Sequence, residues 1–189
     1  MFQPLFLVHF DILLTHSQKG YYMLQKDYPV ILPDYILTQE EFSPENCLFF
    51  DIETTGLSWK TSHLYLLGAV FYENGTWIHR QWFCQKPIEE KDVLLAFSEL
   101  LSTRKLLLHY NGTTFDVPYL MHKYTFYQLP SPWEGTRQMD LYQLFSPLKQ
   151  LLHLDHMRQK DLEQAIGLFR KDRYSGGKLI EVYKKYLLS

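Results

Sequence analysis

Apolar and polar positions in the first half of the chain predict a strand followed by a hairpin. The run from Cys47 to Phe50 is continuously apolar, which is typical of a buried strand. Two more strand-like segments span 64–72 and 76–84. Between them, Glu73-Asn74-Gly75 has the composition of a tight turn. The pattern therefore predicts three strands in antiparallel order.

The second half of the chain alternates helical and strand-like patterns. Pro87 and the acidic pair Glu89-Glu90 precede a segment whose apolar residues recur at helical spacing. Those apolar residues are Val93, Leu94, Phe97, Leu100 and Leu101. A strand over 105–110, a helix after Asp116, a strand over 137–142 and further helical segments follow. This order predicts an α/β fold with a mixed sheet, three antiparallel strands and then strand–helix repeats, flanked by helices.

Length and composition are those of one folded domain. A chain of 189 residues can bury one sizeable core and is short for two. Hydrophobic residues make up 46% and aromatic residues 16% of the chain, which argues against disorder. The segment 16–46 shows no clear periodicity. We therefore expect an N-terminal arm over 1–45 that packs on a domain spanning 46–189.

Three features predict a cytoplasmic location without a membrane partner. The chain has no apolar run of about 20 residues, the length that a membrane-spanning helix needs. The apolar segment 1–10 lacks a basic start and soon meets Asp11, so a signal peptide is not expected. Cys47 and Cys84 form neither a CxxC pair nor a disulfide framework, which is typical of a reducing compartment.

The first chemical feature is a pair of carboxylates at the end of the predicted strand after Cys47. Side chains alternate across a strand, so Asp51 and Glu53 should share one face while Phe50 and Ile52 share the other. Two carboxylates side by side repel unless a cation or a shared proton lies between them. Hard divalent cations prefer such oxygen ligands. The alternative is that the chain simply leaves the core here, with the following Thr-Thr-Gly as a turn.

The second feature repeats the same order of elements. An apolar strand runs into the polar loop Asn111-Gly112-Thr113-Thr114-Phe115-Asp116, and Leu120, Met121 and Tyr124 then follow at helical spacing. Asp116 lies where the chain changes direction, so its carboxylate could point back at the strand ends. Two other interpretations are open: Asp116 as a helix N-cap, and Asn111-Gly112 as a hairpin turn.

These two motifs together resemble those of the DEDD 3′–5′ exonucleases, in the ribonuclease H-like superfamily. Phe50-Asp51-Ile52-Glu53-Thr54 resembles their first motif, and the segment from Asn111 to Asp116 resembles their second. The similarity is closest to the YprB-type branch and covers the chain from Cys47 onward. It is weaker at Met139-Asp140-Leu141-Tyr142 and in the last part of the chain. The resemblance implies a ribonuclease H-like fold.

The resemblance also implies a site and its ligands. Asp51, Glu53 and Asp116 take the first three of four acidic positions and would be both catalytic residues and metal ligands. The implied substrate-binding residues are Thr54, Thr55, Gly56, Leu57, Asn111 and Phe115. The expected cofactor is Mg²⁺ or Mn²⁺ in a two-metal site that hydrolyses phosphodiester bonds. The expected partner is the end of single-stranded DNA or RNA.

The family's fourth acid is missing from the sequence as given. That acid is an Asp preceded, a few residues upstream, by a Tyr or His. Tyr183 is followed by Leu187 where the Tyr version of the pattern needs an Asp. We therefore expect the last motif to lie beyond Ser189 or to be lost, and we expect the second metal ion to be poorly held. Asp140 corresponds to an accessory acidic position rather than to a ligand.

Two alternatives to an active nuclease are open. One is a catalytically inactive ribonuclease H-like domain that binds nucleic acid or docks to a partner. The net charge of −2 lacks the overall basic field of many nucleic-acid binders, so any such contact would be local. The other is an actin-like phosphotransferase, whose phosphate loop usually has Gly two residues after the Asp. Glu53 stands there and would repel a phosphate, which disfavours this class.

Overall fold

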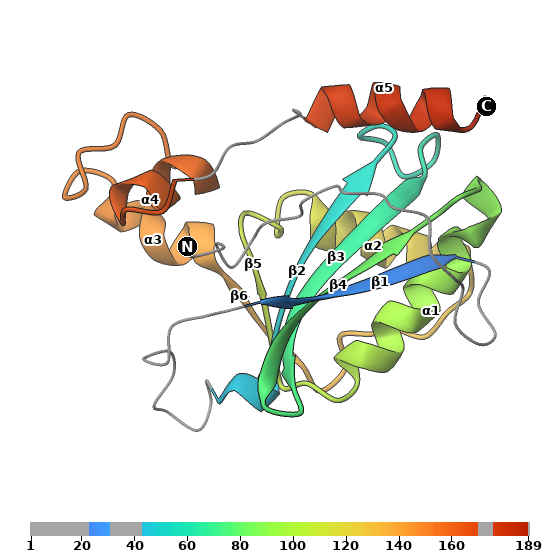
Figure 1. Ribbon diagram of the computed structural model, residues 1–189, viewed down its shortest axis with the longest axis horizontal. Coiled ribbons are helices and arrows are strands. Elements are labelled where there is room, and N and C mark those ends of the chain that lie inside the picture. Colours follow the sequence, from blue (N-terminus) through green and yellow to red (C-terminus); the bar gives the residue numbers. More distant parts are fainter. Residues whose placement is uncertain (1–22, 31–42, 170–175, 189) are drawn as a thin grey trace.

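The computed structural model describes residues 23–30, 43–169 and 176–188, and these form a six-stranded sheet with helices around it (Figure 1). The strands are β1 (Leu24–Val30), β2 (Cys47–Thr54), β3 (Leu64–Glu73), β4 (Thr76–Phe83), β5 (Leu106–His109) and β6 (Arg137–Asp140). The helices are α1 (Glu90–Leu101), α2 (Asp116–Phe126), α3 (Leu141–Phe145), α4 (Gln159–Ala165) and α5 (Gly176–Tyr186). Single 3₁₀ turns are η2 (Pro44–Asn46), η3 (Pro87–Glu89) and η4 (Ser146–Leu148). The predicted mixed α/β architecture is confirmed.

The strand order is β1-β4-β3-β2-β5-β6, and its two halves differ in direction. Neighbours from β1 to β2 pair antiparallel, whereas β2 with β5 and β5 with β6 pair parallel. The carboxyl ends of β2, β5 and β6 therefore lie at the same edge of the sheet. Ligands of open α/β sheets bind at this edge, so it is the first place to look for a site.

The predicted hairpin is confirmed at the level of single residues. β3 and β4 pair up to Glu73 and Thr76, which leaves Asn74 and Gly75 as a two-residue turn. Both have positive φ, 51° and 81°, the backbone conformation that suits the right-handed twist of a hairpin. Asn and Gly tolerate this conformation best, so the local sequence determines the turn.

The strand β1 is an element that the sequence pattern does not predict. It pairs with β4 along its whole length, from Leu24 opposite Phe83 to Val30 opposite Trp77. This edge strand lies within the range expected to be an N-terminal arm. Residues 1–22, including the apolar segment 1–10, and residues 31–42 lie outside the described residues, and the boundary near residue 45 stays a prediction.

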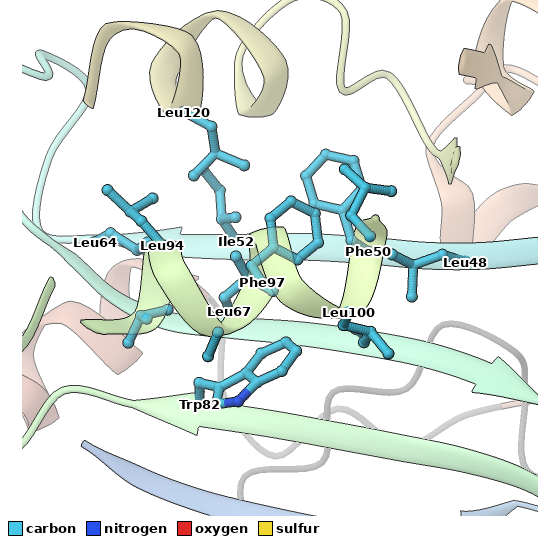
Figure 2. Packing of buried hydrophobic residues seen from close by; sticks show 14 of the residues in the cluster. Leu48, Phe50, Ile52, Leu64, Leu67, Trp82, Leu94, Phe97, Leu100 and Leu120 are labelled. Atoms are coloured by element: carbon cyan, nitrogen blue, oxygen red, sulfur yellow. The ribbon is translucent and has the colours of Figure 1, made fainter. Parts of the chain in front are cut away.

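The main core lies between one face of the sheet and the helices α1 and α2. Figure 2 shows Leu94 and Phe97 of α1 pointing at strand residues that include Phe50 and Ile52. All five apolar residues predicted to form one face of α1 are buried. In α2, Leu120 is buried as predicted. Met121 is 50% exposed, so its placement on the apolar face was wrong.

Cys47 and Cys84 are buried free thiols, in keeping with the absence of a predicted disulfide framework. Burial raises the pKa of Cys47 to about 11 and that of Cys84 well above its usual value, so both stay protonated. Within the described residues, none of the helices has the length and apolar character needed to traverse a bilayer.

Candidate metal-binding carboxylate site

The strand β2 presents Asp51 and Glu53 at its carboxyl end. Phe50 and Ile52 are buried, whereas Asp51 is exposed and Glu53 is half-buried. The two carboxylates therefore leave the strand on the face opposite the buried pair, as the alternation predicted. Their strand neighbours in β3 are Gly68 and Leu66.

Asp116 reaches this strand because β5 stops early. The last parallel pair between β2 and β5 is Phe49 with Leu108, so the edge of β2 beyond it has no strand partner on that side. The Asp116 carboxylate lies beside the backbone N–H of Ile52, the residue between the two β2 carboxylates, and this N–H lowers the pKa of Asp116 against the effect of burial. Three carboxylates from two distant parts of the sequence are thus brought to one end of the central strand.

The two other interpretations of the Asn111–Asp116 loop do not describe this geometry. Helix α2 begins at Asp116 with Phe115 in the capping position, and the Asp116 carboxylate faces β2. Asn111 has a φ of +59° and starts a turn that Thr114 closes by donating its backbone N–H to the Asn111 carbonyl. The chain then continues into α2 rather than into a second hairpin strand.

Burial and like charge raise the pKa of two of these acids. Burial, followed by the charge of Asp51, raises the pKa of Asp116 to about 8, and Glu53 adds to the effect. Burial and then the charge of Asp51 raise the pKa of Glu53 to about 7. The three side chains therefore lie close enough to repel one another when ionised. A divalent cation would relieve that repulsion.

The side chains do not form a closed set of ligands as they stand. Among residues 23–30, 43–169 and 176–188, no three His, Cys, Asp or Glu side chains converge closely enough to hold a metal ion. The donor types nevertheless fit a hard divalent cation, because all three are carboxylates whose charges oppose one another. Binding such an ion would require the three to draw together.

Sequence reasoning missed a tyrosine beside Glu53. The pairing of β2 with β3 shifts between Glu53 and Thr54, so that Tyr65 is left without a strand partner. The Tyr65 hydroxyl lies beside the Glu53 carboxylate and lowers its pKa, although no hydrogen bond of normal geometry forms. A bulge of this kind depends on the pairing of two strands and leaves no mark in the sequence of either one.

Helix α5 covers Tyr65 and approaches the site. The ring of Tyr183 stacks on that of Tyr65 with centroids 4.4 Å apart, and the Tyr183 hydroxyl is buried. A Cβ atom added at Gly176, the first residue of α5, would lie 3.8 Å from Glu53 Oε2. Figure 1 shows α5 lying across this end of the sheet. Tyr183 therefore contributes packing here and is not free to contact a water molecule.

The loop after β2 is fixed by its own hydroxyl groups. The Thr54 hydroxyl donates to the Gly56 carbonyl (2.8 Å), and the Thr55 hydroxyl accepts from the His63 backbone N–H (2.9 Å). Leu57 remains 86% exposed at the tip of the loop. Of the expected substrate-binding residues in this loop, Leu57 is thus the one with a freely accessible side chain.

Asp140, at the end of β6, holds the second loop. Its Oδ1 accepts from the backbone N–H groups of Asn111 (2.8 Å) and Tyr142 (3.0 Å). Its Oδ2 accepts from the backbone N–H of Thr113 (3.3 Å) and from the Thr113 hydroxyl. These hydrogen bonds keep the pKa of Asp140 below its usual value although burial opposes them. Asp140 therefore orients the loop that leads to Asp116, consistent with an accessory position.

His109, at the end of β5, fixes the same Asn111–Asp116 loop through Gly112. The Gly112 backbone N–H donates to His109 Nδ1 (3.2 Å), and burial lowers the pKa of this histidine, so the ring is neutral. A Cβ atom at Gly112 would lie 2.8 Å from two atoms of the ring, so only glycine fits. Asn111 is exposed on the outer side of this loop, whereas Phe115 is half-buried and packs against the main core.

Raising the pH from about 5 to about 8 in a chelating buffer should lower the free energy of unfolding. Glu53 and Asp116 hold their protons up to pH values of about 7 and about 8 in the folded state, against 4.5 and 3.8 as free side chains. The folded state binds more protons in this window, so it loses stability as the pH rises. In Glu53→Gln, the fall in the free energy of unfolding between pH 5 and pH 8 should be smaller by about 1–2 kcal/mol, a value discounted for the partial exposure of Glu53.

Urea unfolding of both proteins at several pH values measures this difference. The comparison cancels the contribution of His109, whose lowered pKa has the opposite sign. A difference between the two proteins that does not change with pH would contradict the assigned repulsion.

Comparisons with known proteins agree with this fold. A family model described as RNase_H superfamily matches residues 48–189, which is most of the chain. A product-bound structure of exonuclease I has a TM-score of 0.54 and 15% identity over 75% of this chain and 42% of its own. A zinc-bound complex of E. coli exonuclease I with single-stranded DNA has a TM-score of 0.55 and 14% identity, and the match covers 75% of this chain and 40% of that protein. The family B DNA polymerase of the archaeon Pyrobaculum calidifontis has a TM-score of 0.57 and 16% identity, and the match covers 77% of this chain and 22% of that protein.

The structural matches cover only part of each similar protein. The chain spans less than half of the length of each of these three proteins, and at such identities the likeness shows the fold alone. No curated protein sequence is similar enough to be called a relative. The YprB-type branch stays a prediction. The family match over most of the sequence and the shared fold together confirm the predicted superfamily: the chain belongs to the ribonuclease H superfamily.

Proposed function

We propose that this chain is a DEDD-type 3′–5′ exonuclease domain that acts on the ends of single-stranded DNA or RNA. The observation that carries the proposal is the approach of Asp51, Glu53 and Asp116 at the carboxyl end of the central strand, where burial and then the charge of Asp51 raise the pKa of the other two. The exonuclease I structure in complex with single-stranded DNA supports this substrate class. The two buried free thiols support the proposed cytoplasmic location.

The three carboxylates would hold Mg²⁺ or Mn²⁺, with Asp51 between the other two. When bound, such an ion stabilises the charge that develops on the phosphodiester oxygens. The protein's own part is to place the Asp116 carboxylate beside the Ile52 N–H at the end of β2. The exposed Leu57 lies in the loop after β2, and the exposed Asn111 begins the loop that ends at Asp116; both would contact the substrate end.

We expect hydrolysis by this chain to be slow. Leu187 occupies the position where the expected pattern has the fourth acid, and the Tyr183 hydroxyl is buried against Tyr65. The groups that would hold a second ion and handle the attacking water are thus not supplied by this part of α5.

A second function, nucleic-acid binding without cleavage, is favoured by one observation. The three carboxylates do not converge closely enough to hold an ion in the described part of the chain. A domain that kept the fold but lost turnover would still bind an oligonucleotide in the presence of a chelator.

End-labelled single-stranded DNA and RNA incubated with Mn²⁺ separate these two functions. The proposal predicts stepwise shortening from the 3′ end that stops with EDTA and in Asp51→Ala. Glu134→Gln is the matched control, because this exposed carboxylate precedes the amino end of β6, whereas the site lies at the carboxyl ends of the parallel strands. Shortening that persists in Asp51→Ala would exclude the assigned site, and metal-independent binding without shortening would favour the second function.

A further inference from the structure

A pocket of about 570 Å³ opens beside the carboxylate site, at the carboxyl ends of β5 and β6. We call it the tyrosine pocket, because Tyr110 follows β5 and Tyr142 lies in α3, and both line it. Its far wall is the segment before and at the start of α4, with Met157 and Arg158. The volume falls in the range of sites that take a small molecule or one nucleotide.

The two tyrosine rings give the pocket an aromatic corner. Their centroids are 5.9 Å apart and their planes meet at 78°, so one ring turns its edge to the face of the other. The Tyr110 hydroxyl donates to the Met157 carbonyl (2.6 Å), which ties this ring to the far wall. A flat aromatic ligand can stack on one ring and meet the edge of the other.

The far wall adds a planar cation whose orientation is fixed. Arg158 is 72% exposed, and its Nε and Nη2 donate to the two carboxylate oxygens of Asp161 at 2.8 and 2.9 Å. This bidentate pair holds the guanidinium plane and neutralises much of its charge. A guanidinium held in this way suits stacking on a nucleobase better than it suits a phosphate.

The pocket and the carboxylate site share the Asn111 loop. Asn111 lines the pocket, and Asp116 at the other end of the same loop reaches β2. Asp140 holds the loop between them through the Asn111 and Thr113 N–H groups. The pocket and the carboxylates thus lie at the two ends of one six-residue loop, which is fixed between them.

We propose that the tyrosine pocket binds a nucleobase of the single-stranded substrate, one or a few nucleotides from the phosphate held at the carboxylates. This rests on the proposed function, and it deepens it by giving the substrate a second point of attachment. Recognition by stacking tolerates any base, so the pocket favours unpaired strands over duplex without reading sequence.

Binding of a fluorescent oligonucleotide in EDTA tests the pocket without any need for hydrolysis. A single-stranded probe carries 2-aminopurine at successive positions from its 3′ end, in DNA and RNA versions. Tyr142→Ala should weaken binding by roughly 5- to 150-fold, the usual effect of losing one stacked base. It should also abolish the 2-aminopurine quenching at one position. Tyr142→Phe should bind within about twofold of the wild type.

Two controls separate stacking from a loss of structure. Tyr28→Ala removes a half-buried tyrosine from β1, the opposite edge strand, and should leave binding unchanged. Arg158→Ala should weaken binding in the same direction as Tyr142→Ala, while both keep the wild-type melting temperature within a few degrees.

The outcomes distinguish this inference from the proposed function. Unchanged oligonucleotide binding by a folded Tyr142→Ala overturns the pocket proposal, whether or not the wild type cleaves. Weaker binding in Tyr142→Ala with the 2-aminopurine quenching kept at every position would also overturn it, since it would show that Tyr142 only supports the loop. If the wild type never cleaves and Tyr142→Ala binds the oligonucleotide more weakly than the wild type does, the pocket proposal is supported and the nuclease proposal is contradicted.

Discussion

Asp116→Asn should remove metal-dependent hydrolysis and, at pH 8 in a chelating buffer, make the protein more stable. The activity should fall by more than about 100-fold, because even a partner outside the metal's own ligands typically accounts for 10- to 100-fold. The stability should rise because the change removes one of three mutually repelling charges, and burial and Asp51 raise the pKa of Asp116 to about 8.

The expected gain is about 1–2 kcal/mol, which corresponds to roughly 2–8 °C in melting temperature for a chain of this size. Melting curves at pH 5 and pH 8, with EDTA or Mn²⁺, measure both effects. The wild type should be stabilised by Mn²⁺ at pH 8, whereas Asp116→Asn should not respond. Glu134→Gln should behave as the wild type does. A loss of stability at pH 8 in EDTA would show that Asp116 supports the fold rather than a metal site.

Lys123→Met should cause the largest loss of stability of any single change considered. Lys123 is 4% exposed and donates to the Ser62 carbonyl (2.7 Å) and to Glu90 Oε2 (3.0 Å). Glu90 is fully buried and also accepts from the Leu64 backbone N–H and the Tyr127 hydroxyl, each at 2.7 Å. Removing the lysine leaves a buried carboxylate without its cation, which typically destabilises a protein by 3–5 kcal/mol.

The corresponding fall in melting temperature is roughly 6–20 °C. Lys91→Met is the matched control, since Lys91 is exposed next to Glu90 in α1 and should change stability by less than about 0.5 kcal/mol. The double change Glu90→Gln with Lys123→Met should recover part of the loss, because it removes both charges and leaves no buried carboxylate without its cation. A loss in Lys123→Met that matches the Lys91→Met control would show that the pair is solvated.

This buried pair also connects the core to the site. Ser62 and Leu64 flank the end of the loop that follows β2, and the Lys123–Glu90 pair holds both of them. The Ser62 hydroxyl in turn donates to the Gly56 carbonyl (2.9 Å). The loop that carries Leu57 is therefore positioned by α1 and α2 and not by its own turns alone.

Local patterns were enough for the elements whose own residues determine them. The strand β2, the Asn74-Gly75 turn and the buried face of α1 follow from alternation, turn composition and helical spacing. The edge strand β1 has no such signal, because it contains Pro29 and a half-buried, mixed composition and is recruited by β4. Met121 was misplaced because spacing alone does not say which flank of an amphipathic helix meets the core.

The candidate site could be predicted in its residues but not in its arrangement. Asp51 and Glu53 share a face because they lie two residues apart in one strand. The approach of Asp116 depends on where β5 stops beside β2, and the place of Tyr65 depends on a bulge between two strands. The buried Lys123 could have been suspected, since it falls at helical spacing after the buried Leu120. Its partner Glu90 lies in another helix and could not.

A crystal structure with Mn²⁺, phased on the anomalous signal of the metal, tests the central claim most directly. The account predicts an anomalous peak bound by carboxylate oxygens of Asp51, Glu53 and Asp116 together. A peak that is missing at saturating Mn²⁺, or one bound elsewhere without Asp116, would contradict it.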